Sequence, residues 1–135
     1  MPGGCVQDEL GGECGCSPPP SGLNDYSDEC HTAAHKWHHT PEGEKVERNK
    51  GEMLMLIVSE IAEAMEGERK DLMDDKLPHR KMVEVELADA LIRIFDYAGL
   101  HGYDLEGAYR EKMEYNRTRE DHTYEHRARE GGKKF

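Results

Sequence analysis

Two pairs of acidic residues have types and a spacing that could bind a metal ion. Glu60 and Glu63 lie three residues apart in IVSEIAEAMEGERKD (57–71), and Glu86 and Asp89 repeat this spacing in EVELADALIRIFD (84–96). Residues three apart on a helix project from the same face, because each residue turns the chain by about 100°. Each pair borders an apolar stripe. Two helices packed antiparallel through these stripes would therefore bring four carboxylates together.

Four clustered carboxylates would repel one another strongly unless a cation lay between them. A site made only of anionic oxygen ligands suits Mg²⁺, with Mn²⁺ as a substitute, better than a metal that prefers thiolates. Glu66 extends the acidic run and is a weaker candidate for contact with a second metal ion. Two alternatives stay open: a non-catalytic acidic interaction protein, whose carboxylates are solvated, and a carboxylate-bridged di-metal bundle. The ferritin-like bundle uses Glu-x-x-His, a pattern that neither pair shows.

The elements that would position these residues are helices. Helical periodicity runs from Leu23 to Arg119, and no segment shows the strict alternation of a strand. Pro78 and Asp104 are typical of helix starts, while Pro41 and Gly43 break the pattern. The predicted helices span about 23–40, 46–72, 78–98 and 104–119. The predicted fold is all-α, an antiparallel bundle of about four helices joined by short connections.

Apolar residues at helical spacing define the faces that we expect to pack in this bundle. On the two helices with the acidic pairs they are Leu54, Ile57, Val58, Ile61, Met65, Leu72, Val83, Leu87, Ala90, Leu91, Ile94 and Ala98.

Composition excludes some classes of partner. The chain has 135 residues and a net charge of −11, which disfavours binding to a nucleic-acid polymer, since phosphates require a basic surface. No apolar run approaches the ~20 residues of a membrane span, and the N-terminus lacks the basic and apolar regions of a signal peptide. We therefore expect a cytoplasmic protein without membrane contact. The low mean hydropathy, −0.92, suggests that part of the chain is not packed, and oligomerisation would help to cover the helices.

The two ends of the chain differ from its centre. Residues 1–22 are rich in Gly, Pro and Cys and have no periodicity, so we expect a disordered extension. Residues 120–135 are charged and interrupted by Gly, and we expect a tail or an arm over a partner subunit. A structural zinc site is the alternative for the cysteines, although the usual CxxC pairs are missing. Those cysteines are Cys5, Cys14, Cys16 and Cys30.

The ordered set of motifs resembles the MazG-like, all-α nucleoside triphosphate pyrophosphohydrolases, the superfamily that includes the dimeric dUTPases and the dCTP pyrophosphatases. The resemblance covers about 23–119. It rests on Glu60-x-x-Glu63, 22 intervening residues and Glu86-x-x-Asp89, within GEMLMLIVSEIAEAMEG and VEVELADALIRIFDYAG, and on the later EKMEYNRTR. The resemblance implies a helical catalytic domain at 23–119 that cuts a nucleotide between its α- and β-phosphates, releasing a monophosphate and pyrophosphate. It also implies that Glu60, Glu63, Glu86 and Asp89 bind Mg²⁺.

Roles for further residues follow from that chemistry. A carboxylate not fully engaged with metal could take the proton of the attacking water, and Glu63 is the candidate for this catalytic base. Lys112, Asn116 and Arg119 fall on one helix face, which could meet the phosphates or could pair with neighbouring glutamates. The family's Lys, Asn and Arg pattern favours phosphate binding. Arg93 is a further phosphate candidate, with a salt bridge that orients Asp89 as the alternative.

The binding of the base is the least defined part. Trp37 could stack on a base or close the core, and Asn49 and Lys50 could reach the nucleotide. Histidines beside Trp37 raise a transition metal as an alternative, but His38 and His39 are adjacent and cannot share a helix face. By family analogy we expect a deoxynucleoside triphosphate as substrate and a homodimer, or a tetramer, as the assembly.

Overall fold

The protein is all-α in the part that a computed structural model describes, residues 19–119 and 123–133. These residues contain no strand, although two isolated bridges pair His39 with Lys45 and Met73 with Lys81. The six helices are α1 (Leu23–Ala33), α2 (His35–His38), α3 (Lys50–Lys70), α4 (Met82–His101), α5 (Leu105–Thr118) and α6 (Tyr124–Ala128).

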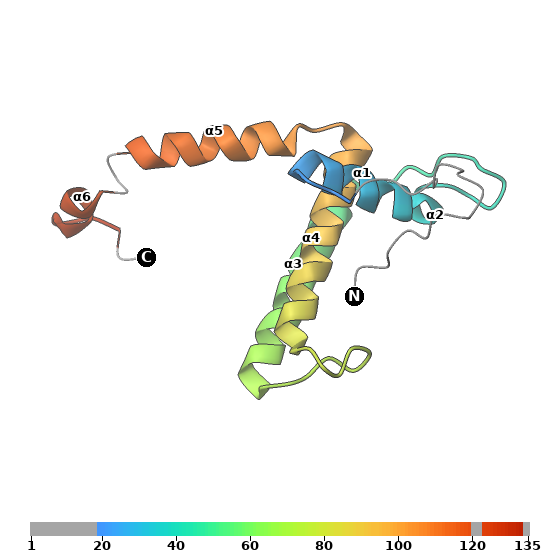
Figure 1. Cartoon of the computed structure of the whole chain (residues 1–135), viewed down its shortest axis with the longest axis horizontal. Helices are drawn as coiled ribbons and strands as arrows, with labels where there is room; N and C mark the ends of the chain where they lie inside the picture. Colours follow the sequence, from blue (N-terminus) through green and yellow to red (C-terminus); the bar gives the residue numbers. More distant parts are fainter. Residues whose placement is uncertain (1–18, 120–122, 134–135) are drawn as a thin grey trace, which may run out of the picture.

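The long helices α3 and α4 form an antiparallel hairpin (Figure 1). Gly67 lets the two backbones approach closely at the looped end, because a Cβ there would lie 3.0 Å from the Cβ of Met82. Asn49 caps the start of α3 by accepting a hydrogen bond from the backbone N–H of Glu52 at 3.0 Å. The hairpin therefore holds the two acidic pairs on neighbouring helices.

Helix α1 packs on the other end of α4. Gly99 is required there, because a Cβ would lie 2.7 Å from the Cβ of His31 and 2.8 Å from the carbonyl oxygen of Ser27. Tyr26 stacks on Phe95 with ring centroids 5.5 Å apart. The buried apolar residues of the described chain are few and small: Met53, Ala64, Ala90, Phe95 and Ala98.

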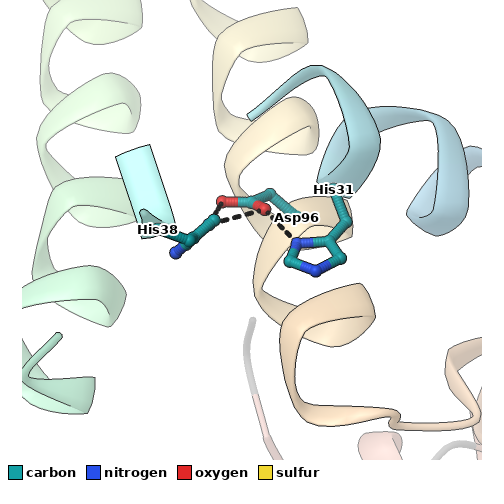
Figure 2. Close-up of side chains that lie close together, drawn as sticks. All are labelled: His31, His38 and Asp96. Atoms are coloured by element: carbon teal, nitrogen blue, oxygen red, sulfur yellow. Dashed lines mark hydrogen bonds and ion pairs between the residues drawn. The ribbon is translucent and has the colours of Figure 1, made fainter. Parts of the chain in front are cut away.

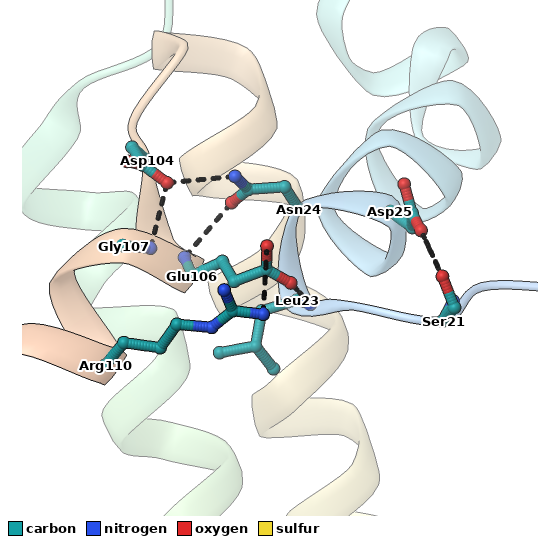
Figure 3. A network of polar contacts seen from close by, with 8 residues as sticks. All are labelled: Ser21, Leu23, Asn24, Asp25, Asp104, Glu106, Gly107 and Arg110. Carbon is teal, nitrogen blue, oxygen red and sulfur yellow. Dashed lines mark hydrogen bonds and ion pairs between the residues drawn. The ribbon is translucent and has the colours of Figure 1, made fainter. Parts of the chain in front are cut away.

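Reciprocal capping joins the N-termini of α1 and α5 (Figure 3). Asp104 accepts hydrogen bonds from the backbone N–H of Gly107 and the side chain of Asn24, both at 2.9 Å. Glu106 accepts in turn from the backbone N–H of Leu23 at 3.0 Å. These bonds satisfy donors that a helix start leaves unpaired. From this junction α5 projects sideways, away from the α3–α4 hairpin (Figure 1).

Several predicted helix boundaries are wrong. The first predicted helix breaks at Ala34, so that α1 and α2 are separate, and the second begins at Lys50 rather than near residue 46. Pro78 does not start a helix: α4 begins at Met82. Asp74 keeps the preceding segment in a loop by accepting hydrogen bonds from the backbone N–H groups of Lys76 and Leu77, at 3.0 and 2.8 Å.

Much of the predicted apolar stripe is exposed. On α3 Leu54 and Ile61 are 47% exposed and Met65 is 56% exposed, whereas Ile57 is half-buried, and on α4 Leu91 is 50% exposed. The single chain is thus a helical hairpin with α1 on one end, and these side chains have no covering layer among the described residues. None of the described helices combines the length and apolar content needed to cross a lipid bilayer.

Candidate functional site

Three carboxylates gather in the groove between α3 and α4. One oxygen each from Glu60, Glu63 and Glu86 lies within 4.8 Å of the others. Glu86 is buried, Glu60 is half-buried and Glu63 is exposed. The antiparallel hairpin produces this arrangement because each glutamate projects from the edge of its helix toward the other helix.

The electrostatics of this carboxylate cluster are unfavourable without a cation. The pKa of Glu86 is raised from 4.5 to about 7, first by burial, then by a hydrogen bond with Glu60 and by the negative charges of Glu63, Asp89 and Glu60. Like charges this close disfavour full ionisation, so the cluster retains a proton near neutral pH. A bound cation would displace that proton, since it favours the ionised carboxylates.

Asp89, the fourth predicted ligand, lies beside the cluster rather than within its 4.8 Å set. Its pKa is also raised, by burial first and then by the charge of Glu60, while the charge of Arg93 opposes the shift. Asp89 lines the cavities on both sides of the cluster. It is therefore placed between the metal candidates and the space for a ligand.

Arg93 forms its ion pair with a different residue from the one considered in the sequence. Its Nε donates a hydrogen bond to Oε1 of Glu60 at 2.7 Å, rather than orienting Asp89. The contact is partly buried and charge-assisted, so it fixes the carboxylate of Glu60. Arg93 also lines the adjacent cavity.

That adjacent cavity has a volume of about 480 Å³ and combines cationic, acidic and apolar walls. Trp37 lies in its wall and is 63% exposed, so it is available for stacking and is not a core residue. Sequence reasoning missed Arg48, which lines the cavity, and favoured Lys50, which does not. Nothing in the sequence distinguishes these two, since both precede the same apolar face. The lining residues are Ala34, Trp37, Arg48, Leu56, Glu60, Asp89, Ile92, Arg93 and Asp96.

A second, acidic cavity of about 760 Å³ lies on the other side of the cluster. Glu63, Glu86 and Asp89 border it together with Glu66 and Asp74. Glu66 is held by Lys70, with Nζ to Oε1 at 2.6 Å, and by Arg69 at 3.6 Å. The weaker candidate for a second metal contact is thus already paired with cations of its own helix.

The predicted phosphate residues of α5 do not meet the carboxylates of the same chain. Lys112 lies over the ring of Tyr115 at 4.9 Å, and Arg119 lies over the same ring at 5.7 Å. Asn116 and Arg119 border a separate hollow near α6. Because α5 projects away from the hairpin (Figure 1), these side chains lie apart from the carboxylates of their own chain.

The histidines and cysteines fall into different surroundings. His39 stacks on His35 with ring centroids 3.8 Å apart, whereas His38 is buried against α4. Cys30 is a half-buried free thiol, and its pKa is raised by burial and then by the charges of Glu29 and Asp96. Cys5, Cys14 and Cys16 lie outside the described residues, as do the predicted disordered extension up to residue 18 and parts of the predicted tail.

Comparisons of the chain with protein-family models, with curated proteins and with solved structures found no match.

Proposed function

We propose that this chain is a Mg²⁺-dependent nucleoside triphosphate pyrophosphohydrolase. The observation that carries the proposal is the carboxylate cluster of Glu60, Glu63 and Glu86, gathered within 4.8 Å beside a cavity with two arginines. An all-oxygen, anionic donor set fits Mg²⁺ or Mn²⁺. The raised pKa of Glu86 supports this fit, because it results from burial first and then from the neighbouring carboxylates. The resemblance to the MazG-like family points to the same activity.

Each residue of the carboxylate cluster has a proposed role that depends on its position. Glu60, Glu63 and Glu86 would hold the ion, with Asp89 beside them. When bound, the ion supplies charge neutralisation for the triphosphate and lowers the pKa of a coordinated water. Glu63 is the most exposed of the three and takes the proton of the attacking water. The water oxygen then bonds to the α-phosphorus, and the bond from that phosphorus to the bridging oxygen breaks, so that pyrophosphate leaves.

The cavity next to the cluster would receive the nucleotide. Arg48 and Arg93 border it and can neutralise phosphate oxygens, while Trp37 offers an exposed ring face for the base. A deoxynucleoside triphosphate is the proposed substrate, on the family resemblance alone. The carboxylate cluster contains no histidine among the described residues, which makes the ferritin-like alternative the weaker one.

The first test is pyrophosphate release from a panel of deoxynucleoside and ribonucleoside triphosphates, with and without Mg²⁺. We expect a monophosphate and pyrophosphate from at least one nucleotide only when Mg²⁺ is present, and loss of this activity in E60Q. Glu68→Gln is the matched control, since Glu68 is an exposed glutamate of the same helix outside the cluster. Absence of cleavage across the panel, or equal cleavage by E60Q, would contradict the proposal.

We also propose that two copies complete the predicted four-helix bundle through α3 and α4. The exposed apolar residues of both helices support this assembly, because they form a face that no other described residues of the chain cover. Sedimentation should give a dimer or tetramer for the wild-type chain. The double variant V58E and I61E should shift it to a monomer, and a monomeric wild type at every concentration would contradict the assembly.

The position of α5 suggests that its basic residues act on the neighbouring subunit's site. Mixing two inactive variants tests this directly: E60Q lacks a working cluster, and K112A lacks a phosphate-binding residue. If α5 acts between subunits, a mixed dimer has one site with both parts intact, so activity returns up to about a quarter of the wild-type level after subunit exchange. If α5 acts within one chain, mixing restores nothing.

A further inference from the structure

Three potential metal ligands from three separate helices meet at the end of the hairpin where α1 packs on α4 (Figure 2). Asp96 of α4 lies between His31 of α1 and His38 of α2. Nδ1 of His31 is 3.0 Å from Oδ1 of Asp96, and Nε2 of His38 is 3.0 Å from both carboxylate oxygens. This histidine cluster of His31, His38 and Asp96 differs from the carboxylate cluster in its donor atoms, because two of its three side chains are imidazoles.

The spacing of these atoms suits one shared ion. Ligand atoms about 2.1 Å from a metal lie ~3.0 Å apart at a right angle and ~3.4 Å apart at a tetrahedral angle, so the observed nitrogen-to-oxygen distance of 3.0 Å is at the short end of this range. The two nitrogens are at most 4.8 Å apart, whereas two nitrogens bound to one tetrahedral ion are roughly 3.4 Å apart, so the imidazoles would close around the ion by rotation of their side chains.

The orientation of the imidazole rings agrees with this. The centroids of His31 and His38 are 5.3 Å apart. The centroid of a metal-bound imidazole lies roughly 3.2 Å from the ion, so this separation corresponds to an angle of about 110° at the ion. That angle is close to tetrahedral, the preferred arrangement around Zn²⁺.

Two of the three side chains are shielded from solvent, and the third is partly open to it. The side chain of His38 is 1% exposed and that of Asp96 is 11% exposed, whereas the side chain of His31 is 33% exposed. An ion could therefore enter from the side of His31, where solvent can also supply a fourth ligand. Two nitrogens and one carboxylate are a borderline donor set, which favours a first-row transition metal over Mg²⁺.

We propose that His31, His38 and Asp96 form a second metal site, for a divalent transition metal of which Zn²⁺ is the representative. The ion replaces the protons through which the imidazoles otherwise donate to Asp96. It joins α1 and α2 to α4 at one point. Because Asp96 and Trp37 both line the 480 Å³ cavity, the ion also fixes that wall of the cavity. Zn²⁺ binding by these three residues does not require the proposed hydrolytic activity.

The test is Zn²⁺ binding to the full-length chain, measured by competition with a chromophoric chelator in excess Mg²⁺, which keeps Zn²⁺ from the carboxylate cluster. The background carries serine at Cys5, Cys14 and Cys16 to remove those thiols as ligands. We expect one equivalent of Zn²⁺ to bind, and H31Q to weaken that binding at least ~100-fold, because even residues that only orient a ligand contribute 10–100-fold.

His35→Gln is the matched control, since His35 is an exposed histidine that stacks on His39 outside the site. Asp96→Asn is the second ligand variant, with circular dichroism confirming that each variant is folded. The Co²⁺ derivative of the background should show the visible absorption of a low-symmetry nitrogen and oxygen site, and H31Q should lose it. A folded background without bound Zn²⁺, or H31Q and D96N that bind as tightly as the background, would overturn the proposal.

Discussion

Helix α4 carries two ligand clusters of contrasting chemistry, about ten residues or ~15 Å apart along its axis. At one end Glu86 faces two more glutamates, and all three can only accept hydrogen bonds once ionised. At the other end Asp96 faces His31 and His38, which can donate. The carboxylate cluster is therefore unfavourable without a cation, whereas both oxygens of Asp96 face an imidazole nitrogen, and only the buried Nδ1 of His38 has no hydrogen-bond partner in this cluster.

The two clusters show that a buried carboxylate can either destabilise or stabilise the metal-free fold, depending on the groups around it. Glu86 is buried among like charges, so its negative charge destabilises the metal-free fold. Asp96 is buried among donors, so its negative charge stabilises the contact of α1 and α2 with α4. Neutralising one carboxylate should strengthen the metal-free protein, and neutralising the other should weaken it.

The largest expected effect is the loss of turnover in E86Q. Removing a metal ligand should lower pyrophosphate release at least ~1000-fold, because the ion contributes several kcal/mol and each 1.36 kcal/mol is a factor of ten. The same substitution should raise the free energy of unfolding of the metal-free protein at pH 8. Steady-state kinetics and urea unfolding measure the two. If E86Q were inactive and also less stable than the wild type, the claim that the charge of Glu86 destabilises the metal-free fold would be wrong.

The next effect is destabilisation by Asp96→Asn without added metal. The amide cannot accept from both imidazoles as the carboxylate does, so we expect a loss of about 2–3 kcal/mol in the free energy of unfolding. Urea unfolding measures it. Asp28→Asn, at an exposed position of α1, is the control and should change stability by less than ~0.5 kcal/mol. Equal stability of D96N and the wild type would show that the histidine contacts contribute nothing.

A smaller effect concerns pH. The pKa of Glu86 is about 7 in the folded chain and 4.5 in its unperturbed state, so the folded protein binds more protons between these values. The stability contributed by protonated Glu86 is complete below pH 4.5 and is lost as the pH rises through 7. The difference between wild type and E86Q, metal-free, should therefore grow by about 1–2 kcal/mol over this range. A constant difference would contradict the assigned crowding.

The pH profile also predicts the behaviour of metal binding. Because the ion must displace the proton of Glu86, Mg²⁺ affinity should rise with pH up to about 7 and then level off. Isothermal titration in buffers of different ionisation enthalpy should show proton release below pH 7. Binding without proton release at pH 6 would place the ion away from Glu86.

The smallest expected effect on stability is that of E63Q, which distinguishes Glu63 from Glu86 within the carboxylate cluster. Glu63 is exposed, so water screens its charge and E63Q should stabilise the metal-free fold by no more than ~0.5 kcal/mol, less than E86Q does. As the proposed base, however, Glu63 should matter for turnover, with a loss of 10²–10⁴-fold. Urea unfolding and kinetics of the same preparation compare the two quantities. If E63Q stabilised the metal-free fold as much as E86Q does, the exposure of Glu63 and the burial of Glu86 would not explain their charges' effects on stability.

The sequence predicted the all-α class and the approach of the two acidic pairs, because both follow from local periodicity. Glu60 and Glu63 are fixed relative to each other by one helix, and the apolar stripes identify the helix edges that meet. The loop at 71–81 is longer than the predicted connection at 73–77, because Asp74 acts through hydrogen bonds to the backbone that no periodicity reveals.

The histidine cluster could not be predicted from spacing. His31 and His38 are 65 and 58 residues from Asp96, and only the packing of α1 at Gly99 brings them together. Similarly, periodicity shows that Val58 and Ile61 belong to an apolar face but does not say what covers it. Position along a helix is a local property, whereas the partner of a helix face is set by tertiary or quaternary packing.

The most direct measurement is hydrolysis of the active deoxynucleoside triphosphate in ¹⁸O-labelled water with Mg²⁺, followed by mass spectrometry of both products. Attack of water on the α-phosphorus places the label in the nucleoside monophosphate and leaves pyrophosphate unlabelled, which is the result we predict. Label in pyrophosphate would mean attack on the β-phosphorus. That result, or the absence of any Mg²⁺-dependent product, would contradict the assignment of the carboxylate cluster to pyrophosphohydrolysis.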